Sequence, residues 1–170
     1  MSKTKKIAIE GVLLAIMIVF QTLKNISPYI TGPVVNLVLI VVTYYFSLED
    51  GIIFSLLSPI TSFIITSNKI MMSVPLVILF VGLGNIVMCL FIRLLKSKNL
   101  ILNLFVSSTL KGIFMTVSIS LIIIPYAVSS GTLPEAAGVV AKATFSLTQF
   151  ITAYIASVIS FFVLKYVKLK

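Results

Sequence analysis

The sequence predicts an all-α integral membrane protein: a bundle of six transmembrane helices with the N and C termini in the cytoplasm. Of its 170 residues, 59% are hydrophobic and only 10% are charged, whereas soluble domains carry about 25% charged residues. A chain of this composition cannot hide its apolar side chains from water, so lipid must surround most of it. Six apolar runs, separated by short basic clusters, account for most of the chain.

The six runs predict one membrane domain over residues 1–170, without a linker or an internal repeat. The predicted spans cover residues 7–23, 33–48, 51–67, 73–95, 101–124 and 143–165. The first run has a basic start, but no small-residue cleavage site follows it. This pattern predicts a membrane helix and not a cleaved signal peptide.

A tight turn separates the second span from the third, and a proline interrupts the third span. The turn, residues 47–51, contains two acids and a glycine, which argue against one continuous membrane helix. Pro59 lacks a backbone donor, so we expect the third span to bend there. Neighbouring hydroxyl groups are then expected to satisfy what the proline frees.

The basic residues orient the chain, because lysine and arginine are enriched on the cytoplasmic side of membrane proteins. With six spans, nine of the thirteen basic residues lie on one side, at both termini and between the fourth and fifth spans. Lys24, Lys69 and Lys142 lie on the other side. Both termini are therefore expected in the cytoplasm. The longest outward connection, residues 125–142, would either act as a lid or only join two helices.

Lys111 is the most informative single residue, because it lies roughly ten residues into the fifth span. A lysine deep in a bilayer costs about 2.5–3.5 kcal/mol on insertion scales. Facing a cavity, it would suit an anionic ligand, in particular a carboxylate. The alternatives are that its long side chain extends to the cytoplasmic headgroups, or that it makes an interhelical hydrogen bond.

Two asparagines within the spans are further candidate ligand contacts. Asn85 lies in the middle of the fourth span, at about the depth predicted for Lys111 and next to two glycines. Asn36 lies in the outer half of the second span. Each amide would either bind a ligand or tie two helices together.

The sixth span begins with a polar stripe. Ser146, Gln149 and Thr152 recur every three residues, which places them on one helix face. Phe145 lies close to this face. The stripe suits a small-molecule pocket or helix packing through small polar residues, and the pocket is favoured because Lys142 lies directly above it.

The residue inventory argues against enzyme chemistry. The chain has no histidine and one cysteine, Cys89, which excludes a His/Cys metal site, a Cys–His nucleophile and a disulfide. Its four acids form no acid–base cluster. The sequence therefore predicts no catalytic residue, no metal and no cofactor in this chain. The basic clusters follow membrane topology, so nucleic acid is not an expected partner.

Small residues form a stripe on the first span. Ala8, Gly11 and Ala15 lie close together on the helix, and Gly11 and Ala15 have the small-x-x-x-small spacing that lets helices touch closely in lipid. The partner would be either another helix of this chain or another subunit.

These features together resemble the substrate-binding S component of an energy-coupling-factor (ECF) transporter, over nearly the whole chain. The resemblance rests on size, six spans and a basic start that runs into a small-residue first span. It also rests on the acidic-glycine turn at 46–51 (FSLEDG) and the proline-broken segment 56–62 (LLSPITS). The family usually carries Ala-x-x-x-Ala on its first helix for docking to a coupling subunit. The match here is Gly11-x-x-x-Ala15, with Ala8 one turn earlier.

The resemblance implies a high-affinity receptor in the bacterial plasma membrane for a small organic micronutrient, a vitamin or vitamin precursor. It implies a pocket in the outer half of the bundle and, as partners, a membrane coupling subunit and two ATPase subunits. The chain itself has no G-x-x-x-x-G-K-[ST] loop, so ATP hydrolysis would come from those partners. Lys111 and the outer lysines favour a ligand with a carboxylate. The alternative is a stand-alone secondary transporter of an organic anion, for which Glu10, near a helix end, is a poor titratable group.

Overall fold

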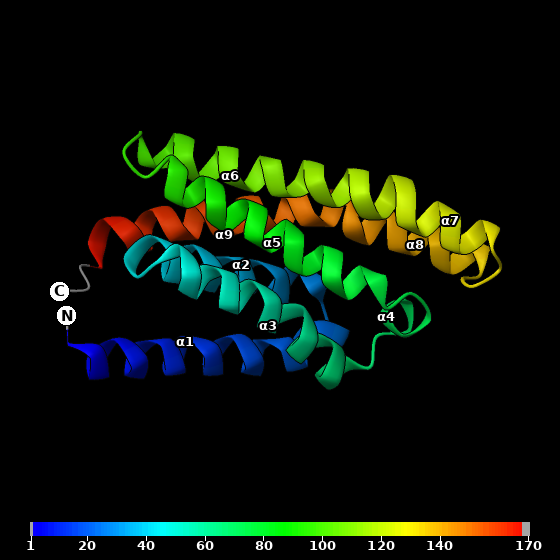
Figure 1. The fold of residues 1–170 in the computed structure, drawn as a ribbon, viewed down its shortest axis with the longest axis horizontal. Helices are drawn as coiled ribbons and strands as arrows, with labels where there is room; N and C mark the ends of the chain where they lie inside the picture. Colours follow the sequence, from blue (N-terminus) through cyan, green and yellow to red (C-terminus); the bar gives the residue numbers. More distant parts are fainter. Residues whose placement is uncertain (1, 168–170) are drawn as a thin grey trace.

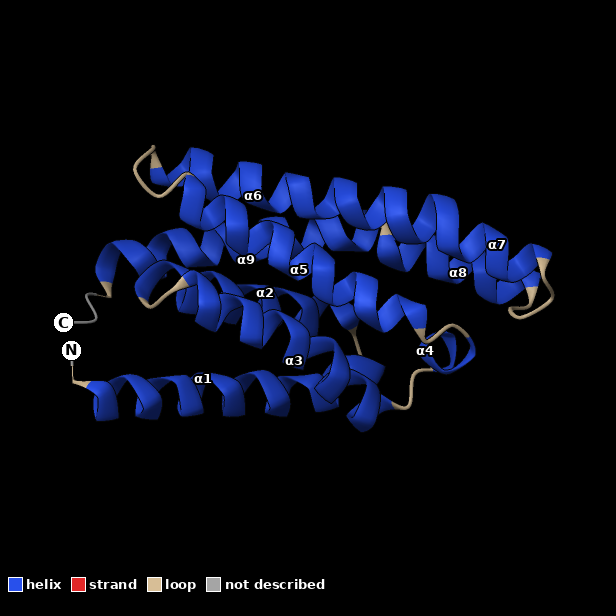
Figure 2. Cartoon of the chain, in the orientation of Figure 1, coloured by secondary structure: helices blue, strands red, loops and turns tan. Residues whose placement is uncertain are grey.

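The structure is a computed structural model that describes residues 2–167, with the backbone alone for Asn25. The described residues form helices joined by short connections and contain no strand (Figure 2). The helices are α1 (Lys3–Thr22), α2 (Pro28–Tyr45), α3 (Leu48–Thr66), α4 (Lys69–Ser73), α5 (Leu76–Leu94), α6 (Leu100–Met115), α7 (Ile124–Ser129), α8 (Glu135–Phe145) and α9 (Leu147–Tyr166). A 3₁₀ turn, η1 (Leu23–Asn25), follows α1, and a π-helical segment, η2 (Thr116–Ile123), joins α6 to α7.

Five helical segments of the described chain are long and apolar enough to cross a membrane. They are Pro28–Tyr45, Leu48–Thr66, Leu76–Leu94, Leu100–Ser129 and Glu135–Tyr166. These segments indicate a multi-pass α-helical membrane protein, as predicted. Helix α1 is of similar length, but Lys3, Lys5, Lys6 and Glu10 make its beginning strongly charged.

The long helices lie side by side along one axis, with the start of α1 and the end of α9 at the same end of the bundle (Figure 1). We call this the terminal end. Helix α4 and the turn between α7 and α8 lie at the opposite end, called the far end. Helix α5 packs against α3 and α6, and α9 packs against α2 and α6. Helix α1 lies at the edge of the bundle, packed against α2 and α3.

Local capping explains where the helices around the first two connections begin. Ser27 caps α2 by accepting a hydrogen bond from the Tyr29 amide, and Pro28 opens the helix at a position where its missing donor does no harm. Helix α2 therefore starts five residues before the predicted span. Ser47 caps α3 in the same way through the Asp50 amide.

The expected outward loop at residues 125–142 is not a loop. Its first part is helix α7, its last part belongs to α8, and only residues 130–134 connect them. Gly131 turns the chain with a φ of 75°, a conformation that glycine adopts without steric cost. The alanine- and valine-rich segment that follows favours helix over loop, which is why the expectation of a long connection is wrong.

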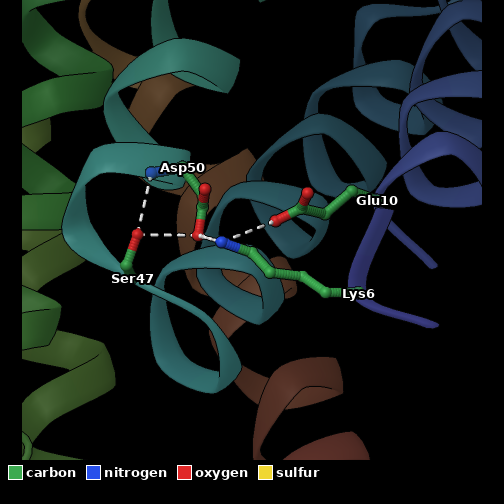
Figure 3. A network of polar contacts seen from close by, with 4 residues as sticks. All are labelled: Lys6, Glu10, Ser47 and Asp50. Carbon is green, nitrogen blue, oxygen red and sulfur yellow. Dashed lines mark hydrogen bonds and ion pairs between the residues drawn. The ribbon is translucent and has the colours of Figure 1, made fainter. Parts of the chain in front are cut away.

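A polar network fixes α1 to the rest of the bundle at the terminal end (Figure 3). The Lys6 ammonium lies 2.6 Å from the Asp50 carboxylate and 3.6 Å from the Glu10 carboxylate on its own helix. The Ser47 hydroxyl donates to the same Asp50 oxygen at 2.6 Å. The i, i+4 contact between Lys6 and Glu10 is thus one part of a larger network that connects α1 to the turn between α2 and α3.

The small-residue stripe of α1 faces away from the bundle. Ala8, Gly11 and Ala15 are all exposed, and a Cβ added at Gly11 would meet no atom within 4 Å. Of the two partners considered for this stripe, a helix of the same chain is therefore excluded within the described residues. The stripe lies on the free side of the edge helix, flanked by exposed apolar side chains such as Val12 and Val19.

Candidate ligand-binding site

A cavity of about 260 Å³ lies in the half of the bundle towards the far end. Its wall combines apolar side chains with amides, hydroxyls and two amines from eight helices and the η1 turn. The lining residues are Gln21, Lys24, Pro28, Thr31, Gly32, Val35, Asn36, Ser58, Pro59, Ser62, Asn68, Ile70, Met71, Val81, Asn85, Lys111, Val140, Thr144, Phe145, Thr148, Gln149 and Thr152. Such a mixture of apolar surface and convergent polar groups is typical of small-molecule sites.

Lys111 enters the cavity from α6 and is 3% exposed. Its ammonium donates a hydrogen bond to the Asn36 side-chain oxygen of α2 at 2.5 Å. Because its polar head is buried against α2, Lys111 does not extend to the headgroups. The interhelical hydrogen bond and the cavity position, which the sequence presented as alternatives, occur together.

Lys24 is the second amine of the cavity, and the sequence did not single it out as a site residue. The η1 turn after α1 directs its side chain inward, where the ammonium donates to the Ser62 hydroxyl at 2.6 Å. Burial lowers the pKa of Lys24 to about 8, because the charged form loses its hydration there. A lysine at the end of a span is ordinarily solvated, so its inward direction depends on the η1 turn.

The charge of the cavity is unbalanced. The described residues that line it include Lys24 and Lys111 but no aspartate or glutamate. Both ion pairs found within the described chain involve Lys6, at the terminal end of the bundle. Each cavity amine is held by one neutral oxygen, which leaves the positive charge without a counter-ion. A buried cation in this state favours an anion.

Asn85 is positioned by the proline of the neighbouring helix. Pro59 has no amide hydrogen for the Ser55 carbonyl one turn earlier, and the Asn85 side-chain NH₂ donates to that carbonyl at 3.4 Å. Gly82 lies at the same helix contact, where an added Cβ would be 3.6 Å from that oxygen, an ordinary van der Waals distance. The Asn85 side-chain oxygen is buried and has no hydrogen-bond partner. The bend was predicted with neighbouring hydroxyls as partners, but the freed carbonyl is satisfied from another helix.

Gln21 fixes the end of α1 to α3 beside the cavity. Its side-chain NH₂ donates to the Ser58 carbonyl at 3.0 Å, and its oxygen accepts from the Thr61 hydroxyl at 2.8 Å. The side chain is 1% exposed, so both of its hydrogen-bonding functions are used inside the protein. Helix α1 is therefore held at both ends, by Lys6 near the terminal end and by Gln21 in the cavity wall.

Helices α8 and α9 form one side of the cavity with part of the predicted polar stripe. Phe145, Gln149 and Thr152 line it, and the Gln149 NH₂ donates to the Thr144 carbonyl at 3.2 Å. Ser146 does not line it. This residue forms the break between α8 and α9, and its hydroxyl donates to the Lys142 carbonyl at 2.6 Å. Because the helix is broken here, Ser146 does not lie on the same face as Gln149 and Thr152, as it would in a continuous helix.

The structure thus brings five of the six predicted contacts to one cavity: Lys111, Asn85, Gln149, Asn36 and Phe145. The contacts that sequence reasoning missed include Gln21, Lys24, Ser62 and Asn68, which lie near the ends of helices. Polar residues are ordinary at such positions and carry no signal by themselves. No family model, curated protein or solved structure matches the chain.

Proposed function

We propose that this chain is the substrate-binding subunit of an ECF-type transporter, which captures a small organic anion at the outer side of a bacterial plasma membrane. The observation that carries the proposal is the cavity with one buried and one half-buried amine and no carboxylate among its described lining residues. A ligand with a carboxylate supplies the missing negative charge, and the surrounding amides and apolar side chains fix its orientation. A vitamin or vitamin precursor of this kind is the expected substrate.

The position of the cavity supports a receptor that faces outward. It lies towards the end of the bundle opposite to the termini, and the basic clusters favour cytoplasmic termini. The cavity therefore opens to ligands from outside in the proposed topology. The chain supplies no Walker loop of its own, which agrees with energy coupling through a separate membrane subunit and two ATPases.

The exposed stripe on α1 supports a coupling partner at the edge of the bundle. Gly11 and Ala15 offer a close-contact surface that no described helix of this chain uses. The same helix contributes Gln21 to the cavity wall at its other end. A partner docked along α1 would therefore contact a helix that also contacts the ligand.

The direct test of this function is to purify the protein from its native host, denature it and identify the released small molecules by mass spectrometry. A stoichiometric carboxylate is the expected result. Transport of that compound in proteoliposomes should then require the coupling subunit, the ATPases and ATP. Uptake by the chain alone without ATP would instead establish a stand-alone secondary transporter, and absence of any bound or transported anion would overturn the proposal.

Bulky substitutions on the stripe separate binding from coupling. Gly11→Leu and Ala15→Leu place added atoms in open space, so the fold and the affinity for ligand should be unchanged. ATP-dependent transport should be lost, because helix contacts through small residues do not tolerate large side chains. Val12→Leu, an exposed neighbour outside the small-residue pattern, is the matched control. Normal transport by both stripe variants would exclude this face as the docking surface.

A further inference from the structure

The two amines of the cavity lie at different depths. Lys111 reaches Asn36, and Lys24 reaches Ser62. Measured from Ser47, in the turn that joins α2 and α3, Asn36 is eleven residues away and Ser62 is fifteen. At about 1.5 Å of rise per residue, this places the two acceptor residues at levels about 6 Å apart along the bundle axis. Lys111 therefore lies in the deeper part of the cavity, and Lys24 lies nearer the far end of the bundle.

Neighbouring residues preserve this arrangement of two separate cationic positions. The deeper part contains the amides of Asn36 and Asn85, which are both 2% exposed. The part of the cavity nearer the far end of the bundle contains the Ser62 hydroxyl and the Asn68 side chain. Asn68 caps α4 by accepting hydrogen bonds from the backbone amides of Ile70 and Met71. Each level thus combines one amine with neutral polar groups, and neither level holds an acid within the described lining.

We infer that the ligand of this cavity is a small organic dianion, with one carboxylate at Lys111 and a second acidic group at Lys24. The inference rests on the proposed function. It narrows the substrate class from a small organic anion to an organic anion with two acidic groups. A monoanion would neutralise one amine and leave the other buried with its charge unpaired. A ligand with an acidic group at each end neutralises both and uses the apolar wall between them for its carbon chain.

The fit to a dianion also explains why the two amines occupy one cavity at all. Each ammonium group has lost hydration inside the cavity and meets only a neutral oxygen, so an uncompensated desolvation cost falls at both positions. A negative group at each amine compensates that cost.

The experiment compares diacids with matched monoacids on the full chain in detergent. Succinate, glutarate and adipate serve as probes, and the monoamide of each diacid keeps the size and removes one charge. Isothermal titration should show that the best diacid binds at least tenfold more tightly than its monoamide. In Lys24→Gln this preference should fall to within about twofold, because the second amine is gone.

Two lysine substitutions control for folding and for general charge. Lys24→Arg keeps the charge and should keep the preference, whereas Lys69→Gln removes an exposed charge from α4 beside the cavity and should change nothing. Equal affinity for diacid and monoamide in the wild-type protein would overturn the inference that the ligand is a dianion. It would not contradict the proposed receptor function. Failure of every diacid to bind would also overturn the inference of a dianion. The receptor function is decided separately, by ligand release and ATP-dependent transport.

Discussion

In the proposed receptor, two lysines of the cavity determine which ligand can bind. Each makes a hydrogen bond to a neutral oxygen, Lys111 to Asn36 and Lys24 to Ser62, and neither meets a carboxylate. Withdrawing an ammonium group from water costs several kcal/mol unless a counter-charge compensates it. The empty protein bears this cost and an anionic ligand removes it. Affinity and instability of the empty state therefore have the same origin.

Lys111→Gln should improve the stability of the empty protein and remove its function. The substitution deletes the buried charge and keeps a donor for the Asn36 oxygen, so we expect the ligand-free protein to gain about 1 kcal/mol. Affinity for the anionic ligand should fall about 50-fold or more, because a charge-assisted hydrogen bond is lost. Thermal unfolding and titration of the same samples measure both effects. Loss of stability with unchanged affinity would identify Lys111 as a structural residue.

Binding should weaken at alkaline pH because of Lys24. Its pKa of about 8 lies below the ordinary value for lysine, since burial disfavours the charged form. The amine is thus protonated below pH 8 and able to pair with an anion. It becomes neutral as the pH rises through 8, so the dissociation constant should increase between pH 7 and pH 9.5. In Lys24→Arg, which stays charged, the increase should be clearly smaller than in the wild-type protein, and an equal increase there would assign the pH effect to another group.

At the scale of helices, α3 and α5 depend on one another through Pro59. The proline frees the Ser55 carbonyl, and the Asn85 side-chain NH₂ donates a hydrogen bond to it. The sequence predicted the bend, because a proline inside an apolar run has few other consequences. It could not predict that the freed carbonyl turns towards α5. That direction depends on the rotation of α3 about its own axis.

A double-mutant cycle tests this dependence. Asn85→Leu should destabilise the protein by about 1–2 kcal/mol, since it leaves the Ser55 carbonyl unpaired in the bundle interior. In a Pro59→Ala background, the new amide at position 59 can donate to Ser55, so the same substitution should cost much less. Unfolding free energies of the four proteins give the coupling between the two positions. Strictly additive changes in unfolding free energy would show that Asn85 does not compensate for the amide hydrogen that Pro59 lacks.

The boundaries of elements were predicted less well than their existence. The predicted connection at residues 125–142 is mostly helix, because η2 carries α6 onward into α7 and α8 precedes α9. The polar and proline residues in this segment suggested a loop, but Pro125 lies inside the continuous helical segment Leu100–Ser129, directly after the π-helical segment η2. One break in backbone direction, at Ser146, then removed a predicted residue from the cavity.

At the scale of the whole molecule, both ends of the described chain lie at one end of the bundle and the cavity lies towards the other. The apolar composition and the clustered lysines were sufficient to predict an all-α membrane bundle. Lys111, Asn85 and Gln149 could be recognised because a polar residue within an apolar span stands out. Lys24 and Gln21 could not, since their inward direction is fixed by tertiary packing around η1.

The orientation in the membrane can be measured with reporters at three positions. Fluorescent proteins fused to the N and the C terminus should both fluoresce, as expected in the cytoplasm. A cysteine introduced at Ser130, in the turn between α7 and α8, should react with a membrane-impermeant reagent in intact cells, while the buried Cys89 should not. A fluorescent N-terminal fusion with a dark C-terminal fusion would indicate an odd number of spans.

The unbalanced charge of the cavity also has a consequence for how long each molecule survives in a cell. A compound that binds only the folded state protects the protein from unfolding, and proteases remove chains that open. A receptor whose empty site is strained should therefore be degraded faster when its nutrient is scarce, so that nutrient supply sets receptor abundance. After synthesis is blocked, the wild-type protein should persist longer in cells that are given the ligand. A variant with both Lys24→Gln and Lys111→Gln should show one half-life under either condition. An unchanged wild-type half-life would mean that proteolysis does not sense the empty site.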